Sequence, residues 1–273
     1  MGDYSSLEIG LCWGTLQQAT LVELIDAAGR HGFPTLSIRP DSVRDCLAGG
    51  MSEAGLRRRL RDAGARVRVI DALSAGLPGM EKVEGVADEA ACFRAAEVVE
   101  SPIINIALYG GEAAPPPQLS EAIGGVSRRA AARGLGIVLE FVPETGIPDI
   151  HAARLIAETC GEPNCRVALD PWHLARSGGT LEDVLAIPRG LIGAFQLDDR
   201  TPPPPGAIYV PMTGRDLPGE GRLPLHDITR AVLANNPALT AEIEVFSAEL
   251  RRLSVDQAAQ RVAEAVRRWR ADL

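Results

Sequence analysis

The sequence lacks the features that mark secreted and membrane proteins. No stretch of its 273 residues approaches the roughly 18 uninterrupted apolar residues needed to span a bilayer. The first ten residues, MGDYSSLEIG, do not show the basic-then-apolar order of a signal peptide. The five cysteines are scattered without a CxxC pair, and an odd number of cysteines fits reduced thiols better than a disulfide framework. We therefore expect a soluble, cytoplasmic protein that does not bind membranes, and we assign its cysteines no chemical role.

Positive charge is also scarce, and this argues against two classes of function. The formal net charge of -8 repels a phosphate backbone, and no stripe of basic residues alternates with aromatics, so we expect no nucleic-acid partner. Lys82 is the only lysine, and it lies in a loop or helix start rather than at the end of an apolar strand. A Schiff-base aldolase, which needs a desolvated lysine, is therefore not expected.

The sequence is rich in alternating strand and helix patterns. Apolar residues make up 46% of the chain, and short β-branched runs recur every few tens of residues, each followed by a longer segment with helical spacing. The predicted strands are Leu7–Trp13, Phe33–Ile38, Arg66–Ala72, Pro102–Leu108, Gly136–Phe141, Cys165–Asp170, Ile192–Leu197 and Leu239–Phe246. Eight such units predict an α/β fold, a single (β/α)8 TIM barrel that covers residues 1–273 as one domain.

Sequence signals also indicate where helices and loops lie. Helices are expected to end at Gly32 and at Gly134, where glycine adopts the left-handed cap conformation. A capping box at 254–257 predicts the start of a C-terminal amphipathic helix that closes the barrel. The segment 198–224 contains TPPPPG and DLPGEGRLP and is too long and proline-rich for an ordinary connection, so we expect a functional loop there.

Polar residues lie near the ends of four successive predicted strands, at Glu140, Asp170, Gln196 and Glu244. The C-terminal ends of barrel strands face the active site. A single carboxylate there is as readily explained by a salt bridge or a cap, but three converging carboxylates repel each other unless a cation neutralises them. Three anionic oxygens and one amide oxygen favour Mn or Mg, with Co or Zn as alternatives. We therefore predict that these four residues bind one divalent metal ion.

Other residues near the predicted strand ends are candidates for supporting roles. His173 follows Asp170 by three residues, so the short turn DPWH places its imidazole beside the metal or on the substrate, for substrate contact or proton transfer. Trp13 and Trp172 would form an apolar wall against a sugar face, unless they are simply core residues. Glu242 and Asp198 share the inward parity of the predicted ligands, so they are candidates either to orient those ligands or to form internal salt bridges.

Five segments, VLEFVP, LDPWHLARSG, FQLDDR, LPGEGRLPL and IEVFS, resemble the sugar phosphate isomerase/epimerase group of the xylose isomerase-like TIM-barrel superfamily. The resemblance spans nearly the whole chain and is sharpest in its second half. It implies that Glu140, Asp170 and Glu244 bind the metal and that His173 contacts the substrate. Gln196 stands where most epimerase-like members have a histidine, in a pattern similar to that of some 3-dehydroshikimate dehydratases. An amide oxygen also coordinates hard cations, so the predicted site is retained.

The resemblance also implies which arginine binds the substrate. Arg215, just before LPGEG, matches a position where related barrels often place a substrate-binding arginine. Arg200 competes for this role, and a solvated surface charge is the alternative for either residue. Related barrels commonly form dimers, so a homodimer is one expected assembly.

The expected reaction is proton transfer next to a carbonyl group. A divalent ion acts as a Lewis acid on the carbonyl and hydroxyl oxygens of a sugar, keto-polyol or related substrate and so acidifies the neighbouring C–H. Glu140 and Glu244 would remove and return the proton through a metal-stabilised enediolate, as in an isomerase or epimerase. If a β-hydroxyl leaves instead, with His173 as the acid, the outcome is dehydration by a lyase of the 3-dehydroshikimate or inosose dehydratase kind. The first half of both reactions is the same, so both remain open.

Three further observations bear on the alternatives. The loop after the third predicted strand, DALSAGLPGM, lacks the arginine expected of a dehydroshikimate enzyme. An endonuclease acting on abasic DNA needs a multi-zinc cluster with several histidines, and the chain has four histidines and an acidic balance, which argues against that reaction. A sugar-binding barrel without catalytic activity is the alternative from another functional class.

Overall fold

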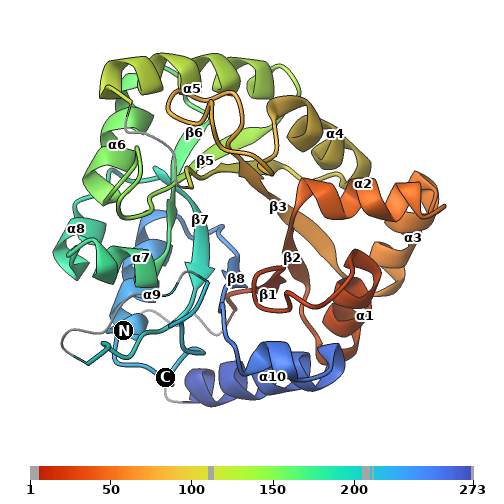
Figure 1. The fold of residues 1–273 in the computed structure, drawn as a ribbon. Helices are drawn as coiled ribbons and strands as arrows, with labels where there is room; N and C mark the ends of the chain where they lie inside the picture. The colour runs from red at the N-terminus through yellow and green to blue at the C-terminus, as the bar shows by residue number, and fades with distance from the viewer. Residues whose placement is uncertain (1–5, 110–113, 205–209, 211, 272–273) are drawn as a thin grey trace.

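The computed structural model describes residues 6–109, 114–204, 210 and 212–271, and its strands form one closed parallel barrel. Each strand pairs with the next along the chain, and β8 pairs back with β1, as the view down the barrel shows (Figure 1). The strands are β1 (Ile9–Cys12), β2 (Thr35–Ile38), β3 (Arg66–Leu73), β4 (Ile103–Ile106), β5 (Gly136–Glu140), β6 (Cys165–Leu169), β7 (Ile192–Leu197) and β8 (Ala241–Ile243). The predicted TIM barrel is confirmed, and all eight strands lie where the sequence indicated.

Helices surround this barrel on its outer side (Figure 1). They are α1 (Leu21–His31), α2 (Pro40–Ala48), α3 (Glu53–Asp62), α4 (Glu89–Val99), α5 (Pro116–Ala131), α6 (Ile150–Thr159), α7 (Pro171–Arg176), α8 (Leu181–Leu185), α9 (Leu225–Asn235) and α10 (Val255–Ala271), with a 3-10 turn η1 (Leu250–Arg252). The last helix, α10, packs against α1 and so closes the ring. Among the helices of the described residues, none has both the length and the apolar run that crossing a membrane requires.

Strands buried on both sides explain the nearly continuous apolar runs of the sequence. Outward-facing residues such as Leu36, Ile70 and Ile104 are fully buried in the main core with the helices. Inside the barrel, small side chains form a separate apolar layer of Val138, Ala168 and Ala194. The polar residues of the strand ends lie beyond this layer, so the barrel is a packed core with its chemistry at one mouth.

Helix boundaries follow most of the predicted signals. Gly32 caps α1 with a φ of 77°, and Ser254 forms the predicted capping box with Gln257, each accepting from the other's backbone N–H at 3.2 and 3.1 Å. The helix expected to reach Gly134 ends earlier, at Ala131, because residues 133–135 turn back onto the carbonyls of residues 130 and 131. Gly134 still adopts the left-handed conformation, with a φ of 73°.

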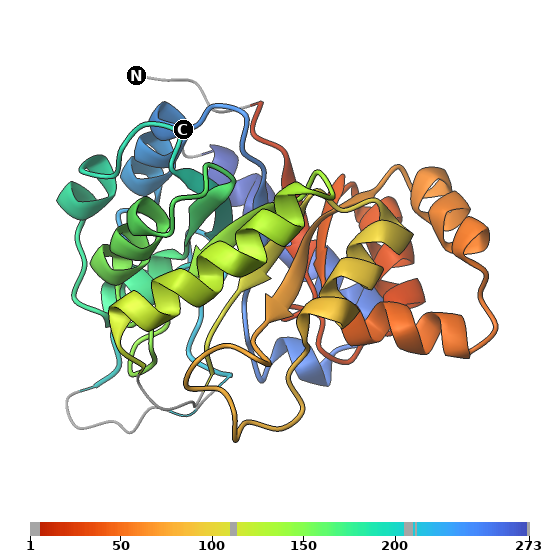
Figure 2. The ribbon, with the colours of Figure 1, turned by 90° about the horizontal axis from the view of Figure 1, so that it is seen from above.

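The long segment after β7 is anchored by one carboxylate. Asp199 forms an isolated antiparallel bridge with Asp216, and its side chain accepts hydrogen bonds from the backbone N–H groups of Gly219 and Leu223 at 3.1 and 3.0 Å. A side chain at position 221 would collide with Asp199, so the second glycine of the PGEG sequence, Gly221, is needed for this close contact. Figure 2 shows that this segment and the loop after β3 extend from the same end of the barrel.

Candidate functional site

A cavity of about 480 Å³ opens at the C-terminal mouth of the barrel. This volume is within the usual range for small-molecule sites. Aromatic side chains form part of its wall, and several charged side chains reach into it. The charged and polar residues that matter for the chemistry come from β3, β5, α7, the loop after β7 and the end of β8; they are Asp71, Glu140, His173, Arg215 and Glu244.

The Asp-Pro-Trp-His sequence builds the first corner of the site. Asp170 ends β6 and is the N-cap of α7, with its Oδ1 accepting from the His173 backbone N–H at 2.8 Å. Pro171 occupies the first helical turn, where its missing N–H costs nothing. This short helix turns the imidazole of His173 back into the mouth, where its Nε2 lies 3.4 Å from Glu140 Oε1 and 3.8 Å from Asp170 Oδ2.

Glu140 belongs to a chain of buried hydrogen bonds that reaches across three strands. The amide of Asn105, in β4, donates to Glu140 Oε2 at 2.5 Å and to Asp71 Oδ1 at 2.8 Å. The indole N–H of Trp13 donates to the other oxygen of Asp71 at 2.7 Å. One amide thus holds two carboxylates in fixed positions, and Trp13 fixes the second of them.

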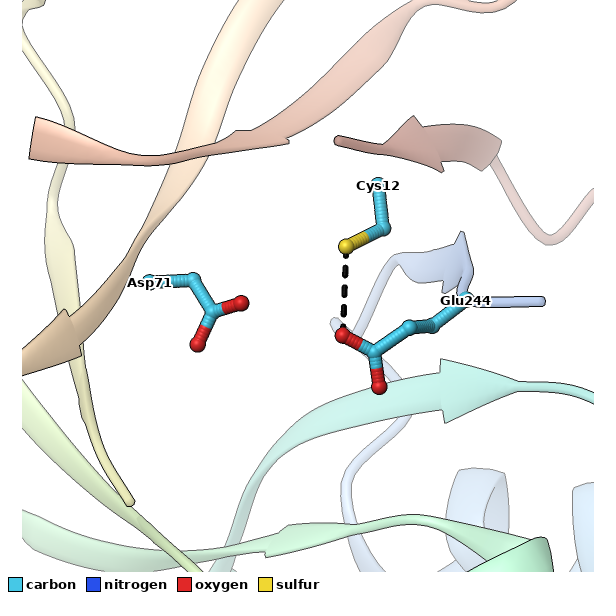
Figure 3. Close-up of side chains that lie close together, drawn as sticks. All are labelled: Cys12, Asp71 and Glu244. Atoms are coloured by element: carbon cyan, nitrogen blue, oxygen red, sulfur yellow. Dashed lines mark hydrogen bonds between the residues drawn. The ribbon is translucent and has the colours of Figure 1, made fainter. Parts of the chain in front are cut away.

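Glu244 lies directly after β8 and faces two different partners. The Cys12 thiol, at the end of β1, donates to Glu244 Oε1 at 3.2 Å, a contact that is visible in Figure 3. The other oxygen, Oε2, lies 3.1 Å from Arg215 Nη1. Arg215 Nη1 also donates to the backbone carbonyl of Glu244 at 3.2 Å.

The guanidinium of Arg215 is the positive charge at the centre of this cluster. Besides Glu244, its Nη1 contacts Asp170 Oδ2 at 2.5 Å and the carboxylate of Asp198. Its Nη2 lies 3.1 Å from His173 Nε2. Because arginine only donates, His173 Nε2 is the acceptor and the imidazole carries its proton on Nδ1.

Burial and mutual repulsion shift the acid strengths of these groups. Burial, followed by the charges of Asp71 and Asp170, raises the pKa of Glu140 to about 8. Burial also raises the pKa of Glu244 to about 8 despite the opposing charge of Arg215. For Asp170, burial is outweighed by the charges of Arg215 and His173 and by its hydrogen bonds, so its pKa is lowered.

Histidine 173 is neutral in this environment. Burial lowers its pKa to about 4, although the charge of Asp170 acts in the opposite direction. Its Nδ1 is buried and has no hydrogen-bond partner among the described residues. The ring therefore presents an unused donor, which is the form needed to contact an oxygen atom or to transfer a proton.

The donor set fits a divalent cation. Glu140, Asp170 and His173 each offer a ligand atom, and these atoms all lie within 4.8 Å of one another. The amide oxygen of Gln196 is buried without a hydrogen-bond partner, as expected of an acceptor that lacks its cation. Glu244 lies close enough to Glu140 for the charge of Glu140 to contribute to the raised pKa of Glu244. These residues would hold the ion; Arg215 already neutralises part of the negative charge around them.

The structure brings together most of the residues predicted from the sequence. Glu140, Asp170, His173 and Glu244 form one contiguous cluster. Gln196 is the penultimate residue of β7, and its side chain lines a small internal cavity with Cys12, Asp71, Asn105 and neighbouring residues. The roles of all these residues in catalysis and metal binding remain predictions.

The other candidates divide into those at the mouth and those away from it. Trp13 lines the cavity, packed edge-on to Phe246 with 5.7 Å between ring centroids. Arg215 also lines it, whereas Arg200 is not among the lining residues. Of the two residues with inward parity, Asp198 binds Arg215 and the Trp172 backbone N–H. Glu242 instead accepts from Thr240 at 2.8 Å and lines the small internal cavity below the mouth together with Gln196.

Sequence reasoning missed three members of the cluster, Cys12, Asp71 and Asn105. Asp71 and Asn105 carry the same signal that identified Glu140, a polar side chain near the end of an apolar strand, in RVRVIDAL and IINI. No comparable signal existed for Cys12, since cysteine is a common core residue. The assignment of no chemical role to the cysteines stays a prediction, although the structure places the Cys12 thiol against Glu244.

Comparisons with known proteins agree with this fold. A search of curated protein sequences found no match. Among solved structures, the IolI protein with a bound zinc atom matches with a TM-score of 0.82 and 17% identity, covering 97% of this chain and 99% of that one. The probable 3-DHS dehydratase AsbF from Bacillus anthracis matches with a TM-score of 0.76 and 14% identity, over 96% and 99%. A D-psicose 3-epimerase matches with a TM-score of 0.72 and 15% identity, over 97% and 99%.

These structural likenesses are at low identity and show the fold alone. The family model described as xylose isomerase-like TIM barrel matches residues 22–272, which is nearly the entire chain. That match agrees with the closed barrel and with the motifs at the ends of β5 to β8. The chain belongs to the xylose isomerase-like TIM barrel family.

Proposed function

We propose that this protein is a divalent-metal-dependent isomerase or epimerase that acts on a sugar, a keto-polyol or a related small carbonyl compound. The observation that carries the proposal is the pair Glu140 and Glu244, two buried carboxyls from different strands that face one cavity beside His173. Two such groups are what a reaction needs when it removes a proton from carbon and returns it at another position or on another face.

The environment of the two glutamates suits this task. The pKa of each is raised to about 8, which brings both carboxyls close to the neutral range in which a group that accepts and returns protons is most effective. Asn105 fixes Glu140 through its Oε2, and this leaves Oε1 directed to His173 and the cavity. When bound, the divalent ion supplies the positive charge that polarises a carbonyl and an adjacent hydroxyl.

The remaining residues of the cavity would position the substrate. Arg215 and His173, which both line the cavity, would contact substrate oxygens, and Arg215 is itself oriented by Asp198. Trp13 and Phe246 form an apolar wall, which suits the C–H face of a sugar or polyol ring and excludes water from the reacting carbon.

Dehydration is the second candidate, and Gln196 favours it. If a hydroxyl two carbons from the carbonyl departs after the first proton transfer, it needs a proton, and the neutral His173 carries one on Nδ1. An amide in place of a histidine on β7 is similar to the pattern of dehydratases, and one structure of the same fold is described as a probable 3-DHS dehydratase. A non-catalytic sugar-binding barrel is the third outcome that an experiment must separate.

Metal analysis followed by hydrogen exchange tests the proposal. The purified protein, loaded with Mn²⁺ or Mg²⁺, is incubated in D₂O with keto sugars, inososes and dehydroshikimate, and deuterium incorporation is followed by NMR. We expect wash-in at the carbon next to the carbonyl of at least one compound, and Glu140→Gln should reduce it about 10²–10⁴-fold. Glu242→Gln is the matched control, because Glu242 is a buried barrel glutamate that does not line the mouth cavity.

The outcomes separate the three candidates. Exchange with an isomeric product supports the isomerase or epimerase, and exchange with loss of water supports the dehydratase. A protein that binds a polyol but shows no exchange into any compound would be a binding barrel. Full metal content and full exchange in both Glu140→Gln and Asp170→Asn would refute the proposed site.

A further inference from the structure

We propose that Cys12, Asp71 and Glu244 form a second site for a divalent cation, beside the one proposed above. The second site would take a thiophilic ion such as Zn²⁺. The inference goes beyond the proposed function and rests on it at one point, because Glu244 would be a ligand of both ions.

The three side chains converge from separate strands on one space (Figure 3). Cys12 ends β1, Asp71 lies in β3 and Glu244 follows β8. One ligand atom from each, a sulfur and two carboxylate oxygens, lies within 4.8 Å of the others. All three are buried, with 1%, 3% and 2% of their surface exposed. The Cys12 sulfur already contacts Glu244 Oε1 at 3.2 Å.

The contacts of Asp71 are those of a carboxylate prepared to bind a cation. Each of its oxygens accepts one hydrogen bond, from Trp13 Nε1 and from Asn105 Nδ2. Both donors are neutral, so they orient the carboxylate without cancelling its charge. Hydrogen bonds of this kind commonly fix the carboxylates that bind metals, and each oxygen retains a lone pair for an ion.

A second observation comes from the space next to these side chains. Cys12, Asp71 and Asn105 line an internal cavity of about 10 Å³ below the mouth, which Glu242 also lines and Glu244 does not. Asn105 is only 2% exposed, and its Oδ1 has no hydrogen-bond partner among the described residues. A buried acceptor without a donor, beside a thiol and a carboxylate, is a combination that a cation satisfies.

The number of carboxyls in the mouth is compatible with more than one ion. The buried carboxyls of the cluster are Asp71, Glu140, Asp170, Asp198 and Glu244. Within the described part of the chain, Arg215 is the one arginine buried among them, so four formal negative charges remain when all five carboxyls are ionised, as they are when they bind metal ions. One divalent ion removes half of this excess, and a second ion removes the rest.

The chemistry of the ligands indicates that the two ions differ in kind. Glu140, Asp170 and an amide offer hard oxygen atoms, which suit Mn²⁺ or Mg²⁺. Cys12 adds a sulfur ligand, which selects softer ions such as Zn²⁺ or Co²⁺. Binding would displace the thiol proton, which passes to solvent as the thiolate coordinates the metal.

Cobalt titration of the full-length, metal-free protein tests the proposal, because Co²⁺ occupies zinc sites and a thiolate ligand gives it a charge-transfer band in the near ultraviolet. We expect two equivalents of Co²⁺ per chain and this band. Cys12→Ser should abolish the band, and Asp71→Asn should weaken the thiolate-bound ion by at least about 10-fold. Cys92→Ser is the matched control, because Cys92 is equally buried but lies in α4.

The metal stoichiometry separates this proposal from the proposed function. One equivalent without a thiolate band would overturn the second site and leave the first intact. No bound metal at all would overturn both. A band that survives in Cys12→Ser would show that another cysteine is the ligand and would also overturn the second site. Thermal melts of the metal-free variants establish that they are folded.

Discussion

Arg215 should be the largest single electrostatic contribution to the stability of the metal-free protein. Its side chain is buried, with 6% of the residue exposed, and Nη1 contacts the carboxylates of Asp170, Asp198 and Glu244. Arg215→Gln keeps a similar length and some hydrogen bonding but removes the charge. Three buried carboxylates then lose their common cation, which is far more costly than losing a surface ion pair.

The size of the effect follows from this geometry. Removing one partner of a buried ion pair costs about 3–5 kcal/mol, and here one partner serves three others. In a chain of this size each kcal/mol lowers the melting temperature by about 2–4 °C, so we expect a fall on the order of 10 °C at pH 8. At pH 5 the fall should be smaller, because protonation neutralises part of the carboxylate cluster.

Differential scanning fluorimetry with excess chelator measures this fall. Arg200→Gln is the control, since Arg200 lies on the same segment outside the cavity lining, and a substitution of this kind usually changes stability by less than about 0.5 kcal/mol. Adding a divalent ion should recover part of the loss, by about 2.7 kcal/mol at a concentration 100 times the dissociation constant. Equal melting temperatures for the two variants would refute the central role of the guanidinium.

Two further predictions concern the proposed ligands. Gln196→His should keep metal binding and shift the preference from Mn²⁺ towards Zn²⁺ or Co²⁺, because imidazole is a softer ligand than an amide oxygen. Competition between the ions for the site measures this preference. Complete unfolding of the variant would instead assign Gln196 to packing. The raised pKa values of Glu140 and Glu244 mean that the native state favours their protonated forms, so the free energy of unfolding of the chelated protein should fall as the pH rises from about 4.5 to about 8. Chemical denaturation across this range checks the sign, and a rise in stability over the interval would contradict it.

The sequence predicted the barrel because strand and helix patterns alternate eight times. Its strand positions were correct, but several ends were placed too far out. β8 was expected over 239–246 and spans Ala241–Ile243. Apolar residues continue past the end of the strand into Val245, which is buried in the main core, and Phe246, which lines the mouth. An apolar run in the sequence indicates buried residues, and at the barrel mouth residues stay buried beyond the end of the strand. The strand predicted from the apolar run is therefore too long.

The candidate site was predicted only on one side of the barrel. Glu140, Asp170 and Glu244 stand out as charges at the ends of apolar strands, and the family motifs lie in the same half of the chain. Asp71 and Asn105 carry the same signal on β3 and β4, but no motif drew attention to them. Their importance becomes evident when the Asn105 amide is seen to join Asp71 to Glu140.

Only the family motif pointed to Arg215, because its position depends on the path of a long segment rather than on strand alternation. Repulsion among the strand-end carboxylates indicates that a cation must be present, but not which one. The structure shows that a guanidinium already supplies part of that charge. Its segment is fixed by the pairing of Asp199 with Asp216, next to Arg215. Metal affinity should therefore depend on the conformation of this segment, since any change that moves the guanidinium alters the charge that the ion meets.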